Sequence, residues 1–346
     1  MPDDTTIMPG QYSVLGASGL LGSHLLSALA NRPGVQVRAV VHHRAPRIQA
    51  PNITPISLDL TDPDQARAAM QGADFAVIAA GIVASAPVLA RDPVGPVLTN
   101  LRIATNALEA AWTEGVARCL LVSSTTGYPA LETSLDEDQF FVGAPPPGWA
   151  GLGQVARFVE TQAHWFAKGL PRSMHVAVIR PTLIYGEYDH FDDETAHFLP
   201  AILRRVVNRE TPIEIWGTGE QTRDLVHGAD VARAALLALA TVQGYRAWTI
   251  GAGEAHSVNA CLNMLLELDG FSNARIVHRL DKPSTVSRRR FDTRRANQEL
   301  GFRPALSLRA GLRRTLEWYH GQGSDPARPE TPQDTALSHR EGNDHG

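Results

Sequence analysis

Residues 12–22 read YSVLGASGLLG, and this stretch decides the fold of the chain. An apolar run of strand length ends at Gly16, further glycines follow at positions 19 and 22, and an amphipathic segment continues from there. Glycines at this spacing permit a tight turn, let the backbone approach a pyrophosphate and let a helix pack closely on a strand. The N-terminus of that helix also attracts phosphate groups. We therefore predict a dinucleotide-binding strand–turn–helix unit, rather than a purely structural turn, with these cofactor contacts: Gly16, Ser18, Gly19, Leu20, Leu21 and Gly22.

The first half of the chain repeats this alternation of apolar runs and helix-length segments. The apolar runs are YSVLG, VQVRAVV, ITPIS, FAVIAAG, ARCLLVSS and, after a long amphipathic segment, HVAVIRP. Strands that alternate with helices form a parallel sheet covered on both faces. The predicted fold class is α/β, a Rossmann-type doubly wound parallel sheet with a smaller C-terminal substrate-binding lobe.

Proline and glycine breaks after residue 181 indicate where the chain leaves the sheet. We assign residues 11–181 to the dinucleotide-binding domain, with 226–252 returning to it, and residues 182–225 and 253–320 to the smaller lobe. Residues 1–10 and 324–346 are expected to be disordered, the latter because they carry almost no large apolar side chains.

Composition excludes several classes of function. The 346 residues are 43% hydrophobic and 20% charged, which is typical of a soluble globular protein. A net charge of −4 argues against a nucleic-acid surface. There is no apolar run long enough to span a membrane, and the acidic N-terminus does not resemble a secretory signal, so we expect a cytoplasmic protein. Cys119 and Cys261 are widely spaced, which predicts reduced core thiols and no metal site.

The residues after the second predicted strand, VVHHRAP, indicate which dinucleotide is bound. An acidic residue there holds the ribose hydroxyls of NAD, whereas a basic residue accommodates the 2′-phosphate of NADP. Arg44, with His43 beside it, therefore favours NADP(H) over NAD(H), although a solvated loop arginine is the alternative. Further cofactor contacts are expected at the ends of other strands, from Asp59, Leu60, Ala79, Ala80, Gly81 and Pro181.

Ordered motifs between Gln11 and Tyr319 carry a resemblance to a known family. They are the three glycines, Asn100 to Asn106, VSSTTGYP, RPTLIYG, HFLPAILRR, WGTGEQTRDLVHGADVARA and DTRRANQELGFRPALSLRAGLRRTLEWY. Together they resemble the extended short-chain dehydrogenase/reductase family, the nucleotide-sugar epimerases and dehydratases. The resemblance implies a nucleotide-linked sugar as the substrate and a homodimer formed through a four-helix bundle.

The resemblance also implies roles for individual residues. Ser124 matches the serine that hydrogen-bonds the sugar oxygen under reduction or oxidation, although a strand-end hydroxyl bonded to backbone is the alternative. His197 matches an acid/base histidine and lies eight residues, about two helical turns, before Arg205. Substrate contacts are expected from Arg205, Trp216, Arg223 and Arg289, because guanidinium groups bind phosphate oxygens well. Arg289 belongs to the run 288–290, which could equally be a solvated basic loop.

Three expected chemical groups are absent. In the register anchored by Glu160, the family's tyrosine and lysine positions hold Leu152 and Ala156, which share one helix face. None of the six tyrosines is followed four residues later by lysine, so the loss does not depend on register. Thr126 stands where some members carry a cysteine acid/base, and its hydroxyl does not ionise near neutral pH.

Two functions remain open at this point. The first is an enzyme in which Ser124, Thr126 and His197, with one of the carboxylates at 136–138, replace the usual proton-transfer groups. The second is a catalytically impaired protein that binds cofactor and nucleotide sugar as a regulatory or partner subunit. A conventional reductase is disfavoured by the missing pair.

Overall fold

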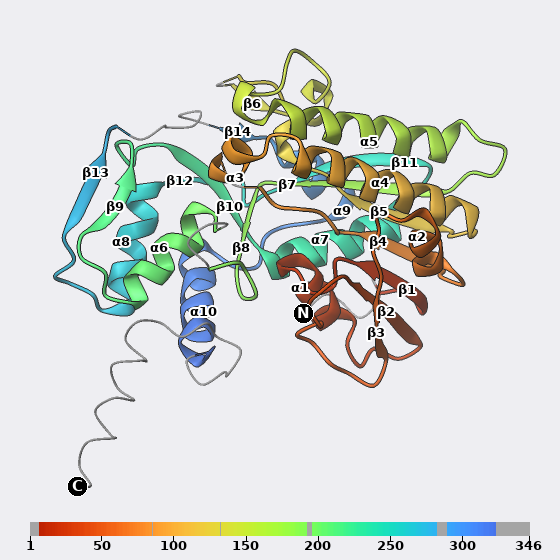
Figure 1. The fold of residues 1–346 in the computed structure, drawn as a ribbon, viewed down its shortest axis with the longest axis horizontal. Helices are drawn as coiled ribbons and strands as arrows, with labels where there is room; N and C mark the ends of the chain where they lie inside the picture. Colours follow the sequence, from red (N-terminus) through yellow and green to blue (C-terminus); the bar gives the residue numbers. More distant parts are fainter. Residues whose placement is uncertain (1–6, 85, 132, 192–195, 282–288, 323–346) are drawn as a thin grey trace, which may run out of the picture.

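A computed structural model describes residues 7–84, 86–131, 133–191, 196–281 and 289–322. Seven parallel strands form the central sheet in the order β11-β7-β5-β4-β1-β2-β3 (Figure 1). They are β1 (Gly10–Leu15), β2 (Val35–Val41), β3 (Ile53–Ser57), β4 (Phe75–Ile78), β5 (Arg118–Val122), β7 (His175–Pro181) and β11 (Tyr245–Ile250). Because β1 pairs with both β2 and β4, the strand order reverses beside it, where doubly wound sheets bind ligands. The predicted Rossmann-type α/β class is confirmed.

Helices cover both faces of the sheet and bury two apolar layers. One face carries α1 (Leu20–Leu29), α7 (Gly228–Thr241) and α9 (Arg294–Leu300). The other carries α2 (Pro63–Met70), α4 (Gly95–Thr113) and α5 (Ala150–Lys168), while the short α3 (Ala86–Arg91) precedes α4. Local sequence explains several helix ends: Asp62 accepts backbone N–H groups at the start of α2, and Gly270 ends α8 (Val258–Asp269) in the left-handed conformation.

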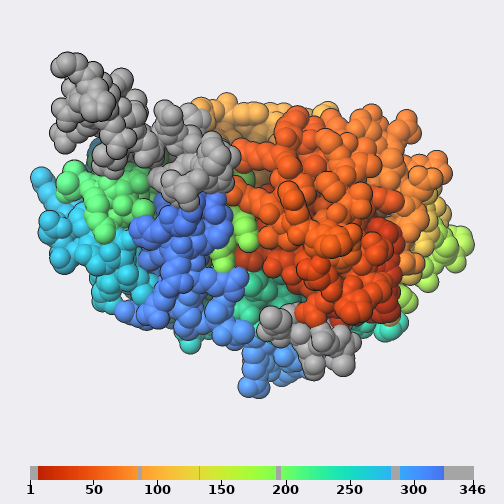
Figure 2. All heavy atoms as spheres, turned by 90° about the horizontal axis from the view of Figure 1, so that it is seen from below, coloured from red at the N-terminus to blue at the C-terminus, as the bar shows by residue number. Residues whose placement is uncertain are grey.

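A smaller lobe, with its own apolar core, adjoins the carboxyl ends of the strands (Figure 1). Its strands are β8 (Leu183–Tyr185), β10 (Thr222–His227) and β12 (Ala255–Ser257), and β9 (Ile213–Trp216) paired with β13 (Ile276–Arg279). Its helices are α6 (Phe198–Val207), α8 (Val258–Asp269) and α10 (Leu308–Gly321). Figure 2 shows the blue segment that contains α10 between this lobe and the orange N-terminal half.

Short elements join the two parts of the molecule. A two-stranded sheet pairs β6 (Ser134–Leu135) with β14 (Arg290–Phe291). Three single turns of 3₁₀ helix lie along the same stretch of chain: η1 (Thr125–Gly127), η2 (Glu137–Gln139) and η3 (Pro147–Trp149). All of these elements except β14 precede α5 in the chain, and Ser124 caps η1.

The structure corrects two of the predicted boundaries. Residues 7–10, expected to be disordered, are ordered: the Tyr12 hydroxyl donates to the Met8 carbonyl over 2.8 Å, and β1 begins at Gly10. Residues 294–302, assigned to the smaller lobe, place Phe302 and two residues of α9 in the apolar layer beneath the sheet, because α9 packs on α7 and β11. The expected disordered tail, 324–346, lies outside the described residues.

Candidate active site

The glycine-rich turn forms a close backbone cradle. Gly16 has a φ of +80°, and a Cβ there would lie 2.7 Å from the carbonyl oxygen of Ala79. A Cβ at Gly22 would lie 2.1 Å from the carbonyl oxygen of Gly16, so only glycine fits either position. The following helix, α1, starts at Leu20 after Gly19 and has no side-chain cap, which leaves its first N–H groups available to an anion. These residues fit a dinucleotide pyrophosphate.

The other predicted cofactor contacts line the same edge of the sheet. Arg44 is exposed in the loop after β2, beside the stacked rings of His42 and His43, whose centroids are 3.5 Å apart. Asp59 accepts hydrogen bonds from the Thr61 hydroxyl and backbone N–H, and these bonds lower the pKa of its carboxyl. The remaining contacts lie at or just after strand ends: Leu60, Ala80 and Gly81, with Pro181 closing β7.

The Ser124 loop follows β5 and forms η1. The Ser124 hydroxyl oxygen accepts hydrogen bonds from the Thr126 backbone N–H at 3.2 Å and from the Thr126 hydroxyl at 2.9 Å. Because both of these bonds bring hydrogen to Ser124, its own proton is left to donate to another acceptor. Thr126 therefore orients Ser124 rather than supplying an ionisable group.

The positions of the missing pair lie at the start of α5. Ala156 is 5% exposed and packs in a small apolar cluster with Tyr128, Leu135 and Phe140. The Phe140 ring also covers Gly127, where a Cβ would lie 2.3 Å from the ring edge. Leu152, one turn earlier, is half-buried. Apolar packing thus occupies the space around Ala156, and neither position can transfer a proton.

A buried ion pair supports this region from below. Glu160, fully buried on α5, accepts from Arg180 on β7 at 2.6 Å and from the Ser123 hydroxyl at 2.5 Å. The Tyr245 hydroxyl lies 3.3 Å from the same carboxylate. Three strands and α5 are therefore tied together directly beneath the Ser124 loop.

Arg157 is a site residue that the sequence did not reveal. Its guanidinium donates to the carbonyls of Gly127 at 2.8 Å, Gly143 at 2.7 Å and Val142 at 3.0 Å. One cation thus joins α5 to the Ser124 loop and to the segment that precedes α5. The only signal in the sequence was an arginine directly after the vacant lysine position, and its carbonyl partners depend on tertiary structure.

Arg289, with Arg223 near it, reaches the Ser124 loop from the smaller lobe. Arg289 donates through Nη2 to the carbonyl of Thr125 at 3.0 Å, and its buried Nε has no hydrogen-bond partner among the described residues. Burial and, to a smaller extent, the charge of Arg223 lower the pKa of Arg289 to about 10. Burial also lowers the pKa of Arg223, whose Nη1 donates to the Thr222 carbonyl. Adjacent buried cations favour an anionic ligand.

Comparison with known proteins identifies the family. A family profile described as "NAD dependent epimerase/dehydratase family" matches residues 12–251. This chain belongs to that family. The resemblance predicted from the sequence motifs is thereby confirmed, and the relatives of this chain include proteins named GDP-L-fucose synthase.

The relatives of this chain include a putative GDP-L-fucose synthase 2 from Arabidopsis thaliana, which is 26% identical over 88% of this chain and 90% of the relative. A dTDP-4-dehydro-6-deoxy-D-allose reductase from a Streptomyces species is 30% identical over 88% of this chain and 95% of the relative. The solved structure of MoeE5 in complex with UDP-glucuronic acid and NAD is 28% identical, with a TM-score of 0.79, and the match covers 90% of this chain and all of MoeE5.

The remaining predicted substrate residues of this epimerase/dehydratase lie on α6 and β9. His197 directly precedes α6 rather than lying within it, so it does not share a helix with Arg205 as its spacing suggested. Burial lowers the pKa of His197, and His190 adds to this. Arg205 donates to the Glu214 carbonyl at 2.7 Å, which anchors it beside β9, and Trp216 ends that strand with 40% of its surface exposed.

The acidic candidates at 136–138 have structural partners in this family member. Asp136 caps η2, and Glu137 is buried and accepts from the Thr249 backbone N–H at 2.7 Å. Asp138 pairs with Arg295 at 2.6 Å on the surface. Because each carboxylate is already engaged, the expectation that one of them moves protons is not supported by the geometry.

Two composition-based expectations can be compared with the structure. Cys119 and Cys261 are both buried and unbridged, and burial raises the pKa of each thiol to about 12. Across the described ranges, no helix has the length and hydropathy needed to cross a bilayer.

Proposed function

We propose that this protein is an atypical NADP(H)-binding epimerase or reductase that acts on a nucleotide-linked sugar. The observation that carries the proposal is the position of Arg289, a half-buried cation that bonds to the Ser124 loop while its buried Nε has no hydrogen-bond partner in the described part of the chain. An anionic substrate that satisfies this group would lie directly beside the Ser124 hydroxyl. The names of the relatives, a GDP-sugar synthase and a dTDP-sugar reductase, support a nucleoside diphosphate as that anion.

The cofactor is proposed to be NADP(H) rather than NAD(H). The glycine cradle of residues 16–22 fits the pyrophosphate, and the exposed Arg44 follows β2, where a 2′-phosphate would be received. When bound, a nicotinamide dinucleotide supplies or accepts hydride. The chain itself supplies the pyrophosphate cradle and the small residues at the end of β4.

The proposed proton chemistry uses Ser124 and His197. Ser124 donates a hydrogen bond to the sugar oxygen, because both acceptor positions of its own oxygen are taken by Thr126. Burial keeps His197 neutral near pH 7, so its imidazole can accept a proton from the sugar, and the imidazolium that results can give this proton back. Arg157 holds the Ser124 loop in place through the Gly127 carbonyl.

The test combines binding and turnover. Calorimetry with GDP and dTDP should show binding that Arg289→Ala weakens at least tenfold, whereas the exposed neighbour Arg290, changed to Ala, should bind normally. NADPH oxidation should then be followed with GDP- and dTDP-linked 4-keto-6-deoxy sugars, and His197→Ala should abolish it. Failure of both nucleotides to bind at millimolar concentration would exclude the sugar-nucleotide substrate.

A second candidate function is a binding subunit without turnover. The packing of Ala156 against Phe140 favours this second function, because an apolar cluster occupies the position where the family carries its lysine. Under this alternative, NADPH and nucleoside diphosphates still bind, but no keto sugar is reduced by the unmutated protein. The same measurements therefore separate the two functions.

We also propose that the protein forms a homodimer through α4 and α5, which lie side by side (Figure 1). On α5, Phe158 and Trp165 are two turns apart and more than half exposed. Leu98 on α4 is 41% exposed. Large apolar side chains exposed along adjacent helices are typical of an interaction face.

A further inference from the structure

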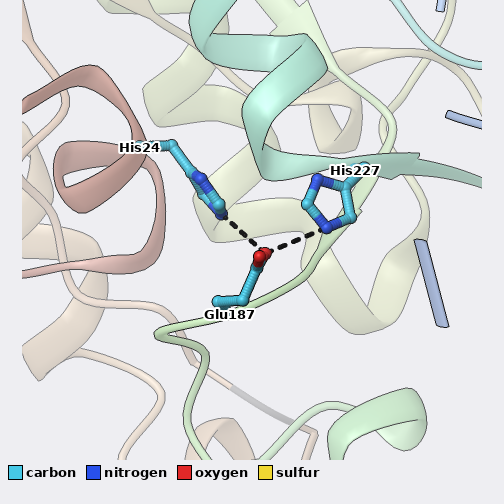
Figure 3. A group of neighbouring side chains, drawn as sticks. All are labelled: His24, Glu187 and His227. Carbon is cyan, nitrogen blue, oxygen red and sulfur yellow. Dashed lines mark ion pairs between the residues drawn. The ribbon is translucent and has the colours of Figure 1, made fainter. Parts of the chain in front are cut away.

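Two histidines and a glutamate from separate elements meet in a buried cluster (Figure 3). His24 lies on α1, Glu187 follows β8, and His227 precedes α7. The Oε2 atom of Glu187 lies 3.0 Å from His227 Nε2 and 3.6 Å from His24 Nε2. None of these three atoms makes a well-aligned hydrogen bond within the described part of the chain. The cluster lies outside the site described above.

The same three atoms lie within 4.8 Å of one another, which is close enough for a metal-ligand set. Two observations argue against a metal. The Nδ1 atom of His227 accepts the backbone N–H of Ala229 at 3.2 Å, so Nε2 carries the hydrogen and cannot ligate. Arg314 already donates to Glu187 from the other side, which places a cation where a metal would be repelled. Proton binding fits this cluster better than metal binding.

The cluster connects α1 with α10 through Glu187 and its neighbour Tyr188. Arg314, which reaches Glu187, lies on α10, the helix that lies between the lobes (Figure 2). The Tyr188 ring packs edge-on against His24 at 5.3 Å and against Trp318 of α10 at 5.3 Å. Tyr188 has a φ of +71°, an uncommon conformation for a residue with a side chain, which surrounding contacts must hold in place.

We propose that His24, Glu187, His227 and Arg314 form an acid-sensitive latch that holds the cofactor-binding helix α1 to α10 and releases it when His24 gains a proton. In the closed state the Glu187 carboxylate balances Arg314, and His24 is neutral. A proton on His24 adds a second positive charge to a buried cluster with a single carboxylate. Opening lets water reach that charge.

The electrostatics of the cluster agree with this arrangement. Burial, together with the nearby His227 and Arg314, outweighs the opposing charge of Glu187 and lowers the pKa of His24 to about 4. Burial raises the pKa of Glu187, but the close contact with His227 and the other nearby charges outweigh burial and bring it to about 2. Other titratable or charged groups that interact with the cluster or its neighbours are Tyr185, Tyr188, Asp230, Cys261 and Arg47.

The direction and size of the effect follow from proton linkage. A histidine exposed by opening has a pKa near 6.5, above its value of about 4 in the closed state, so the open state binds the proton more tightly. The latch is therefore fully stable above pH 6.5 and loses stability as the pH falls from 6.5 towards 4. Between pH 7.5 and pH 5.0 the opening equilibrium should rise about 30-fold. Glu187 contributes little in this range because both of its pKa values lie below pH 5.

Hydrogen–deuterium exchange of the full chain tests the latch without substrate or turnover. Exchange of α1 and α10 amides is measured at pH 7.5 and 5.0 and corrected for the intrinsic rate, with α5 as an internal reference. The wild-type chain should show about a 30-fold faster corrected exchange at pH 5.0 in α1 and α10 only. In His24→Gln this ratio should fall below about threefold. In Glu187→Gln, exchange should already be fast at pH 7.5.

The matched control is His278→Gln, which changes an exposed histidine on β13 and should keep the wild-type ratio. An unchanged ratio in His24→Gln, or no pH effect in the wild-type chain, would overturn the latch. Stoichiometric cobalt(II) binding with visible absorption bands that His24→Gln abolishes would also overturn it and restore the metal site. The wild-type pH profile decides the matter even if a variant fails to fold.

Discussion

Replacing Ala156 with lysine tests whether the missing catalytic pair was merely lost or replaced by packing. Ala156 is 5% exposed against Tyr128 and Phe140, so a lysine side chain would overpack this cluster at about 1–3 kcal/mol. Burying the amine uncharged at pH 7 costs about 4–5 kcal/mol more, because a lysine pKa of about 10.4 must fall below 7. The total is roughly 5 kcal/mol or more, from a typical stability of about 5–15 kcal/mol.

Urea unfolding of Ala156→Lys measures this loss directly. The control is Gln154→Lys, an exposed position on the same helix, which should change the free energy of unfolding by less than about 0.5 kcal/mol. Phe140→Ala added to Ala156→Lys should recover part of the loss, because the two side chains compete for one space. We further expect Leu152→Tyr with Ala156→Lys to oxidise NADPH no faster than the unmutated protein while Phe140 remains.

If Ala156→Lys were as stable as Gln154→Lys, the space around position 156 would admit a lysine, and the packing argument would be wrong. The site would then be a simple deletion of two functional groups. NADPH oxidation by the double variant well above that of the unmutated protein, with Phe140 intact, would refute the reasoning in the same way.

Three further predictions concern the cofactor cradle, the Ser124 loop and the outer face of α5. Gly22→Ala should weaken NADPH binding, measured by calorimetry, by more than about tenfold, because the added Cβ would lie 2.1 Å from a backbone oxygen. The control is Gly148→Ala, whose added Cβ meets no atom within 4 Å and which should bind NADPH normally. Arg157→Ala should lower the free energy of unfolding by about 2–4 kcal/mol, since it removes three hydrogen bonds worth about 1 kcal/mol each, and equal stability in urea would contradict its role. Phe158→Glu with Trp165→Glu should yield a folded monomer by light scattering, and a persistent dimer would place the interface elsewhere.

Local patterns were sufficient to predict the Rossmann-type sheet that forms the N-terminal half of the molecule. A glycine at position 16 or 22 indicates that another part of the backbone lies too close for a side chain. In the structure, Gly16 lies against the backbone of Ala79, and Gly22 lies against the backbone of Gly16. Alternating apolar runs predicted the parallel strands for a similar reason, since a strand buried on both faces must be apolar throughout. The absence of the Tyr and Lys pair was equally local, because four-residue spacing on one helix can be read directly.

The roles of Arg157, Arg289 and the His24 cluster could be decided only by tertiary structure. Their partners are backbone carbonyls or single side chains far away in the chain, and a carbonyl leaves no mark in a sequence. The carboxylates at 136–138 show the opposite case: they are suitable proton-transfer groups by type, yet each is already bonded within the fold. Sequence by itself determined the fold, the cofactor cradle and the missing chemical groups, because these depend on near neighbours. Tertiary structure decided which of the remaining charges are free to act, because a charge is available only when no distant part of the chain already satisfies it.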